Sequence, residues 1–424
     1  MQKIRTRQSR RKIRQSTSGG LVLVKRQLLV YTPFKDIFNE LFKKRFGLSF
    51  LSLWLIMVFR ALLGGSSFQQ FEKNWNNDKT WKIIANYKNN IIHRLLARNI
   101  HRISPQMSKK MVIGTVKNLH QKGLVLGKRV AIDSSPITVK GKKYEKSGAV
   151  TKNGKYSIGY KLSVAFDLDS KVPLGYILTS INVHDSQMLI PLIKMIQSEY
   201  NNSVESVMID RGYYGADFFK FLDNQNIKFF IPAKKYTKLN EQIESLQFND
   251  FKENKSKKYF FKDGTIELAK YGSIRCIFIS YKRFEEWMPK EERNNRIWVL
   301  LTNDKNISPK NAVLAYKARW QIEVFFKQIK NELGLKILPG RDFRIVSMHV
   351  SSVLLAYIGL ISLVLEERQK NESVPIAIKE WKNKFIKVIL SIVLERDRIY
   401  FEFEDAWIYN WSIMEKDLNG GVLM

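Results

Sequence analysis

Cysteine, histidine and acidic residues are all scarce in this sequence. Its 424 residues include one cysteine, Cys276, and five histidines. A disulfide framework, a cysteine-based zinc finger and an iron–sulfur cluster each need more cysteines, so all three are excluded. Five histidines are also too few for a histidine-rich metal site. A single cysteine fits a chain that works in the reducing cytoplasm.

The shortage of acidic residues leaves the chain strongly basic. There are 72 Lys and Arg residues against 39 Asp and Glu, which gives a formal net charge of +33. Such a charge makes a compact monomer repel itself and therefore favours a polyanionic partner. Nucleic acid is the first candidate and an anionic membrane surface the second. The 45% hydrophobic and 12% aromatic residues can build large cores, which excludes global disorder.

Composition divides the chain into four segments. Residues 1–30 hold nine Lys or Arg and no acid, which predicts a flexible basic arm. Residues 31–125 repeat apolar residues at helical spacing and predict a helical domain, whose positive charge suggests DNA binding. Residues 126–365 predict the main α/β domain. Residues 366–424 hold 11 acidic and nine basic residues, which makes this segment a candidate oligomer contact.

Two apolar runs raise the question of a membrane. Residues 46–59 are uncharged for 14 positions, which is short for a span, whereas residues 345–365 are uncharged for 21. The longer run contains one histidine and four serines, and a helix buried inside a domain is also apolar all round. We therefore predict buried helices and no membrane, with a basic membrane-associated protein as the alternative. No apolar stretch with a small-residue cleavage site follows the basic N-terminus at signal-peptide distance, so we do not expect secretion; a transit peptide would share this composition.

Beyond Gly127 the pattern alternates between strands and helices. Strands are predicted at 128–132, 156–168, 175–183, 204–209 and 227–231, and helices at 184–200 and 214–224. This order predicts an α/β layer architecture with a mixed sheet. Short strands then predict a β-rich insertion at about 233–302. The next helix should begin at Ser308 and Pro309 and run to about Leu333, with Gly334 marking its end.

Three acidic residues have positions suited to chemistry. Asp133 and Asp210 each follow a predicted apolar strand, and strand ends are where α/β sheets hold ligands. Glu323 lies within the predicted long helix. Hard divalent cations such as Mg²⁺ are often held by a few carboxylates plus substrate phosphates, and two such ions can drive phosphoryl transfer. The alternative is that a strand-end aspartate is a turn former or helix cap.

The helix around Glu323 carries a narrow polar stripe. At 100° per residue, Tyr316, Arg319, Glu323 and Lys330 fall within an arc of about 60°. Arg319 and Lys330 beside a carboxylate would suit contacts to phosphates. A solvated face with an Arg319–Glu323 salt bridge remains the alternative.

The same four residues spell Y-x2-R-x3-E-x6-K. This pattern resembles the signature of the DDE transposases of a large bacterial insertion-sequence family, whose catalytic core has a ribonuclease-H-like fold. Residues 131–135 resemble the first-aspartate block of that family, and residues 208–215 resemble its second-aspartate block. The β-rich stretch before Glu323 is similar to the subdomain inserted in these enzymes. The resemblance covers about residues 125–365.

The resemblance implies a complete set of functional expectations. Asp133, Asp210 and Glu323 would bind the metal, Mg²⁺ with Mn²⁺ as a substitute and two ions expected. The enzyme would hydrolyse one strand at each transposon end, and the freed 3′-OH would then attack the other strand or target DNA. Double-stranded DNA would be the partner, both as transposon ends and as target. A homodimer would hold paired ends, in the bacterial cytoplasm and at the nucleoid.

Further residues have candidate roles, and an alternative function stays open. By the resemblance, Tyr316, Arg319 and Lys330 would contact phosphates of the transposon end. Trp298 and Trp320 are candidates for stacking on a displaced base, although Trp298 lies in an apolar strand and suits a core position better. The alternative function is a catalytically decayed or nuclease-only DNA-binding relative with the same fold.

Overall fold

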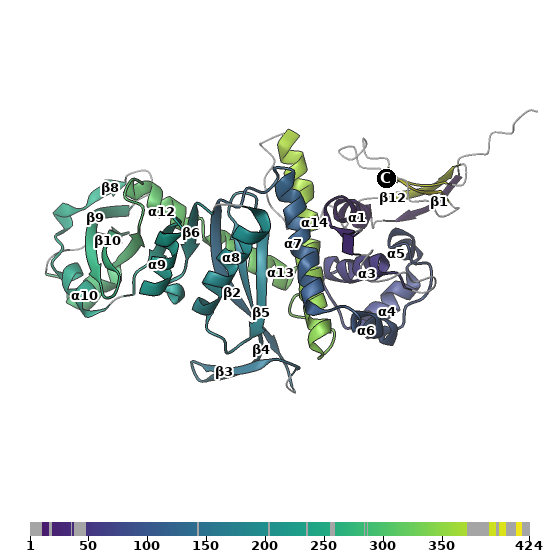
Figure 1. Cartoon of the computed structure of the whole chain (residues 1–424), viewed down its shortest axis with the longest axis horizontal. Coiled ribbons are helices and arrows are strands. Elements are labelled where there is room, and N and C mark those ends of the chain that lie inside the picture. Colours follow the sequence, from purple (N-terminus) through teal and green to yellow (C-terminus); the bar gives the residue numbers. More distant parts are fainter. Residues whose placement is uncertain are drawn as a thin grey trace, which may run out of the picture. The chain divides into compact units, whose positions relative to one another are not determined.

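The computed structural model describes most of the chain. The described residues are 11–16, 19–34, 36–37, 48–141, 144–201, 204–234, 236–254, 259–283, 285, 287–370, 390–395, 398–403 and 413–417. They gather into two compact units, one of residues 1–118 with 328–424 and one of residues 119–327 (Figure 1). The predictions for residues 1–10, 38–47 and most of 371–424 concern residues outside the described ones.

Residues 119–327 form an α/β unit. Its strands are β2 (Arg129–Val139), β3 (Gly148–Lys152), β4 (Lys155–Asp167), β5 (Pro173–Ser180), β6 (Ser206–Ile209), β7 (Lys228–Pro232), β8 (Lys252–Asn254), β9 (Tyr259–Leu268), β10 (Gly272–Ser280) and β11 (Ile297–Thr302). Its α-helices are α8 (Leu189–Tyr200), α9 (Ala216–Asn224), α10 (Thr237–Glu244), α11 (Lys290–Arg296), α12 (Pro309–Lys317) and most of α13 (Trp320–Asn331). Short 3₁₀ turns are η1 (Asp185–Met188), η2 (Arg211–Tyr213) and η3 (Phe248–Asp250).

The sheet topology confirms the predicted ribonuclease-H-like fold. Strands β2, β4 and β5 form an antiparallel meander, and β6 and β7 then add in parallel beside β2. The centre of the sheet is therefore ordered β5-β4-β2-β6-β7. Parallel neighbours need a crossover connection, which α8 and α9 provide. The apolar strands predicted from the sequence thus exist in the predicted order.

The inserted segment continues the same sheet rather than forming a separate one. Strand β11 pairs antiparallel with β7, and β10, β9 and β8 follow outward in turn. Two helices, α10 and α11, lie within the stretch for which only strands were predicted. The single helix expected up to about Leu333 is also divided, because α12 ends at Lys317 and α13 begins at Trp320.

The other unit is largely helical. Its helices are α1 (Gly19–Tyr31), α3 (Phe50–Leu62), α4 (Phe68–Asn77), α5 (Lys79–Ile84), α6 (His93–Ile100), most of α7 (Pro105–Gln121) and α14 (Phe343–Lys370). Strands β1 (Arg11–Ser16), β12 (Leu390–Glu395), β13 (Arg398–Phe403) and β14 (Ile413–Asp417) form a four-stranded sheet. The chain from Gly19 onward is therefore a helix with buried side chains such as Leu21 and Val24, and not part of a basic arm.

Both apolar runs form helices inside this unit. Helix α14 is long and apolar enough to cross a membrane, but its apolar window is 100% buried within the structure, as in the core helix of a globular protein. Helix α3, which contains most of the shorter run, is buried along nearly all of its length. The prediction of buried helices is confirmed for the described part of these runs.

A buried charge joins α3 to α14 and to the chain that precedes α14. The Arg60 side chain is 0% exposed, and its guanidinium donates to the carbonyl oxygens of Ser66 (2.7 Å) and Ile337 (2.8 Å) and to His349 Nδ1 (3.0 Å). Because Arg60 donates, Nδ1 accepts, and the opposite nitrogen Nε2 donates to the carbonyl of Leu335 at 3.2 Å. His349 is therefore neutral in the folded protein.

This pairing predicts how stability changes with pH. Burial, together with the charge of Arg60, lowers the pKa of His349 to about 3. The unfolded chain takes up a proton below about pH 6.5, whereas the folded chain does not. The contribution to stability is therefore complete above pH 6.5 and is lost as the pH falls toward 3, by at most about 1.4 kcal/mol per pH unit. Denaturant unfolding at pH 7 and pH 5 should show this loss, and a His349→Gln variant should lack it. Equal pH dependence in both proteins would contradict the assignment.

Candidate active site

Strand register places the two aspartates side by side. In the parallel pair β2–β6, Ile132 is opposite Ile209, so Asp133 and Asp210 are the next residues on neighbouring strands. Both isoleucines are fully buried, and side chains alternate between the faces of a sheet. Asp133 and Asp210 therefore leave the sheet on the same face, on backbones that run about 4.8 Å apart.

The two aspartates differ in their local backbone. Strand β6 ends at Ile209, and the Asp210 side chain caps η2 by accepting a hydrogen bond from the Arg211 N–H at 2.7 Å. Strand β2 instead continues through Asp133 to Val139, so the expectation that Asp133 ends a strand is wrong. The reason is the pairing of β2 with β4, which satisfies the backbone of Ser134 and Ser135 in a stretch whose composition suggested a turn.

Helix α13 is held against the aspartate face of the sheet. Phe166 on β4 is paired with Ala131, two residues before Asp133, and its ring packs 5.0 Å from that of Phe325 on α13. The Lys171 ammonium also donates a hydrogen bond to the side chain of Gln321. Contacts on both sides of Glu323 thus fix the first turn of α13, and with it the Glu323 carboxylate.

The break between α12 and α13 aims Arg319 at the carboxylates. Hydrogen bonds from the N–H of residue 319 to Tyr316 (2.9 Å) and of residue 322 to Arg319 (3.0 Å) span three residues, which marks a tight 3₁₀-type turn. From this turn the guanidinium donates to Asp133 Oδ2 at 3.3 Å and to the Glu323 carboxylate. The polar stripe was expected on one continuous helix, but its residues lie on two helices joined by this turn. Arg319 nevertheless forms the expected pair with Glu323.

The electrostatics of the site are resolved at Asp133 and at Arg319. Burial raises the pKa of Asp133 to about 6, and the negative charges of Asp210 and Glu323 add to the rise. The hydrogen bond from the Ser134 N–H and the charge of Arg319 oppose it. Burial alone would lower the pKa of Arg319. Tyr316 and the carboxylates of Asp133 and Glu323 outweigh burial and raise this pKa. The site therefore concentrates negative charge, which Arg319 partly neutralises.

The three carboxylates are ligands suited to a hard divalent cation, but in this structure the Arg319 guanidinium is the positive group that pairs with two of them. Carboxylate oxygens are the protein ligands that Mg²⁺ and Mn²⁺ prefer. Among the described residues, no three metal-binding side chains stand in a geometry that could hold an ion. The Arg319 guanidinium bridges Asp133 and Glu323, while its Nε is buried without a hydrogen-bond partner. The three carboxylates fit a metal ion if the Arg319 side chain moves away from Asp133 and Glu323 to pair with another anion, such as a phosphate.

The other predicted residues have distinct surroundings. Tyr316 is half-buried, and the centre of its ring lies 5.8 Å from the centre of the Trp298 ring. The Arg319 guanidinium carbon lies 5.7 Å from the centre of the Tyr316 ring. Trp298 is half-buried, whereas Trp320 is 62% exposed. Lys330 lies in the last turn of α13. The roles of these four residues remain predictions.

Sequence reasoning missed a hydrogen-bonded support beneath the aspartates. On the opposite face of β2, the Ser134 hydroxyl lies 2.7 Å from the Ser163 hydroxyl and 3.2 Å from the Tyr213 hydroxyl. These contacts link β2, β4 and η2, and so they fix the residues adjoining Asp133 and Asp210. The two serines after Asp133 were the one sequence signal that could have indicated this support.

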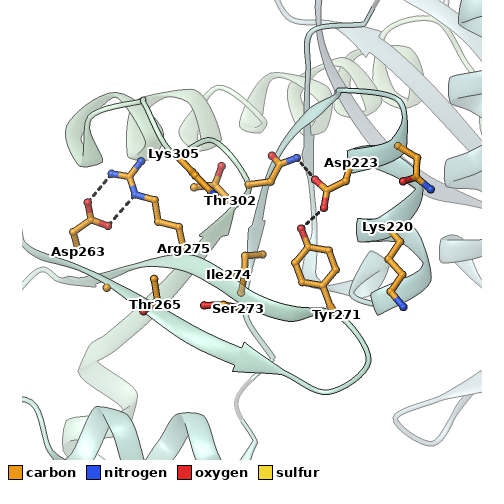
Figure 2. A pocket seen from close by; sticks show the side chains of 13 residues that line it. Lys220, Asp223, Asp263, Thr265, Tyr271, Ser273, Ile274, Arg275, Thr302 and Lys305 are labelled. Atoms are coloured by element: carbon orange, nitrogen blue, oxygen red, sulfur yellow. Dashed lines mark hydrogen bonds and ion pairs between the residues drawn. The ribbon is translucent and has the colours of Figure 1, made fainter.

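A polar cleft in the same unit is lined by other residues than Asp133, Asp210 and Glu323. It has a volume of about 810 Å³ and lies where α9, β11 and the β9–β10 turn meet. Asp223 accepts hydrogen bonds from Tyr271, as Figure 2 shows, and from Asn303 at 2.6 Å. Arg275 is paired with Asp263 at 2.6 Å. Because these groups satisfy one another, we interpret them as the brace that fastens the insertion to the core.

Comparisons with known proteins show what the chain is similar to. A family model described as the transposase DDE domain matches residues 126–358, more than half of the chain. A Sinorhizobium fredii protein named as the transposase y4zB is 28% identical over 53% of this chain and 58% of its own length. A Geobacillus stearothermophilus protein named as the transposase for insertion sequence element IS5377 is 20% identical over 59% of this chain and 61% of its own length. The chain thus spans about three fifths of these curated relatives.

A solved structure with a similar trace is the piggyBac transposase synaptic complex with hairpin DNA. It covers 87% of this chain and 79% of its own, with a TM-score of 0.43 and 11% identity. Asp133, Asp210 and Glu323 all lie within the matched range. By that match the chain belongs to the transposase DDE domain family.

Proposed function

We propose that this protein is a metal-dependent DNA transposase that cuts the ends of its insertion sequence and joins them to target DNA. The observation that carries the proposal is the placement of Asp133 and Asp210 side by side at one face of the sheet, with Arg319 bridging Asp133 to Glu323. Both curated relatives are named as transposases, and one is named for an insertion sequence, which supports the same activity.

The proposed roles of the residues follow from their chemistry. Asp133, Asp210 and Glu323 would hold Mg²⁺ or Mn²⁺, with two ions expected. When bound, the metal supplies an activated nucleophile and stabilises the leaving oxygen in phosphoryl transfer. Arg319, with its unpartnered Nε, would bind a phosphate oxygen of the DNA end. Tyr316 would support Arg319 from beneath, and Lys330 would contact phosphate as a point charge.

The proposed partners are double-stranded DNA, as transposon ends and as target, and a second copy of the chain when paired ends are held. The net charge of +33 favours such binding, which would be strongly salt-dependent. We assign DNA binding to the helical segment 31–125 and oligomer contacts to 366–424. The place of action is the bacterial cytoplasm, at the nucleoid.

A cleavage and joining assay on DNA that carries the element's own ends tests this function. The full chain is incubated with labelled end DNA and a target plasmid, with Mg²⁺ or with EDTA. We expect nicking at the ends and joined products only with the metal. Nicking without joined products would indicate the nuclease-only alternative. DNA binding without any cleavage would indicate a catalytically decayed relative.

The position of Arg319 predicts an unusual metal-binding phenotype. Because the guanidinium competes with a cation for Asp133 and Glu323, Arg319→Gln should bind Mn²⁺ about tenfold more tightly than the wild type without DNA. End DNA should strengthen Mn²⁺ binding by the wild type more than by the variant, because phosphate draws the arginine away. Electron paramagnetic resonance of free Mn²⁺ measures both effects.

A matched control is available on α11. Arg296 pairs with Glu292 at 2.6 Å with the same four-residue spacing as Arg319 and Glu323, and neither residue belongs to the site. Arg296→Gln should leave Mn²⁺ binding unchanged. Weaker Mn²⁺ binding by Arg319→Gln than by the wild type would contradict competition and make Arg319 a support for the metal.

A further inference from the structure

A hairpin extends the sheet well beyond the carboxylates. Strand β2 continues from Asp133 to Val139, and β3 and β4 then form a hairpin at the same end of the sheet (Figure 1). Its turn is Asn153-Gly154, with Lys152 paired to Lys155. Both turn residues have positive φ, 51° and 71°, as a tight two-residue turn of this hand requires. The hairpin is therefore a defined element and not a loose loop.

The base of the hairpin is also fixed. The Ser147 hydroxyl donates to the Tyr144 carbonyl at 2.7 Å, and the Tyr160 hydroxyl donates to the carbonyl of Glu145. Tyr160 is fully buried. The hairpin thus starts from the packed core and presents its tip in a set direction.

The tip carries exposed positive charge and an exposed aromatic ring. In the sequence, the hairpin together with the chain that leads into it, residues 140–155, includes six lysines and one glutamate. Lys140, Lys152 and Lys155 are exposed, and among the described residues no acidic side chain pairs with any of the three. Tyr156, beside the turn, is 65% exposed. Lysines on an edge strand also discourage sheet-to-sheet aggregation, which is the alternative role to be tested.

Strand register gives the reach of the hairpin. Asp133 is paired with Val164, and Lys155 lies nine residues earlier on the same strand. At about 3.3 Å per residue this is about 30 Å along the strand. One helical turn of B-DNA measures about 34–36 Å. A duplex with one phosphate at the carboxylates would thus meet the hairpin about one turn away. There, strand alternation puts Tyr156 on the carboxylate face of the sheet and Lys152 and Lys155 on the other face, flanking the turn.

We propose that the β3–β4 hairpin binds the backbone of duplex DNA about one helical turn from the phosphate held at the carboxylates. This inference rests on the proposed function. The lysines contact phosphates without reading sequence, and the hairpin therefore sets the register and direction of the duplex. A second copy of this chain fits the surface less well than DNA does, because two chains of +33 repel each other.

The test compares DNA binding by the full-length wild type and by a Lys152→Gln/Lys155→Gln double variant, which keeps the turn. Fluorescence anisotropy over a range of salt concentrations is measured with a long duplex and with one cut to about six base pairs on the hairpin side. With the long duplex we expect affinity to fall about five- to fiftyfold and the salt slope to fall by about 1.8, close to 0.9 for each lost phosphate contact. With the short duplex the two proteins should bind equally.

A control variant, Lys194→Gln/Lys220→Gln, removes the same charge from exposed positions on α8 and α9. Equal losses in both variants, or the same loss with the short duplex, would overturn the proposal and leave a general charge effect or edge protection. A wild-type dimer in sedimentation that becomes monomeric in the hairpin variant would also overturn it, in favour of a second copy. Because binding needs no catalysis, a protein that never cuts DNA would refute the proposed function and leave this result intact.

Discussion

Replacing Glu323 by glutamine is expected to reduce metal-dependent cleavage of the element's ends by about a thousandfold or more, while DNA binding persists. The substitution keeps the size of the side chain and removes only its charge. Glu323 supplies one of the three carboxylates, and its partner Arg319 also contacts Asp133. The substitution should therefore weaken both metal binding and the positioning of Arg319 for a phosphate. Electrostatic groups of this kind supply much of the acceleration in phosphoryl transfer.

Single-turnover cleavage and filter binding, measured on the same preparations, separate chemistry from binding. Glu292→Gln is the matched control, since Glu292 also pairs with an arginine one helical turn away but lies on α11. It should cut at the wild-type rate. A Glu323→Gln protein that cuts within tenfold of the wild type would remove Glu323 from the proposed metal site, and Asp210→Asn would then show whether either aspartate is needed.

Replacing Arg60 by alanine is expected to lower the free energy of unfolding by about 3 kcal/mol or more, because each buried acceptor left without a donor costs about 1–3 kcal/mol. The substitution leaves a cavity and deprives His349 Nδ1 and the carbonyls of Ser66 and Ile337 of their donor. Unpaired buried acceptors are costly because no water replaces the lost hydrogen bond. Burial lowers the pKa of Arg60 to about 9, because the surrounding side chains exclude water.

Denaturant unfolding, followed by circular dichroism, measures the change. Arg102→Ala removes an exposed arginine from the same unit and should alter stability by less than about 0.5 kcal/mol. Arg60→Lys keeps the charge without the planar fork of donors and should lie between the two. A loss below about 1 kcal/mol for Arg60→Ala would show that the network is not important for folding.

The features that the sequence predicted well are those that depend on local pattern. Apolar runs of strand length predicted the five central strands, because burial on both faces leaves a continuous apolar signal. Gly334 was predicted to end a helix, and it has a φ of 68° soon after α13. The cap at Ser308 was also correct, since its side chain accepts from Asn311 N–H. Each of these signals lies within a few residues of the feature that it specifies.

By itself, then, the sequence determined the order of the central strands, the α/β class and the three candidate acidic residues, and its resemblance to DDE transposases added the ribonuclease-H-like fold. Only the tertiary structure decided that β2 continues past Asp133, that β11 joins the insertion to the main sheet, and that Arg319 bridges Asp133 and Glu323. Asp133 and Glu323 lie on a strand and a helix far apart in the chain. The register of paired strands and the docking of α13 bring them together, and such long-range contacts leave no periodic trace in the amino-acid sequence.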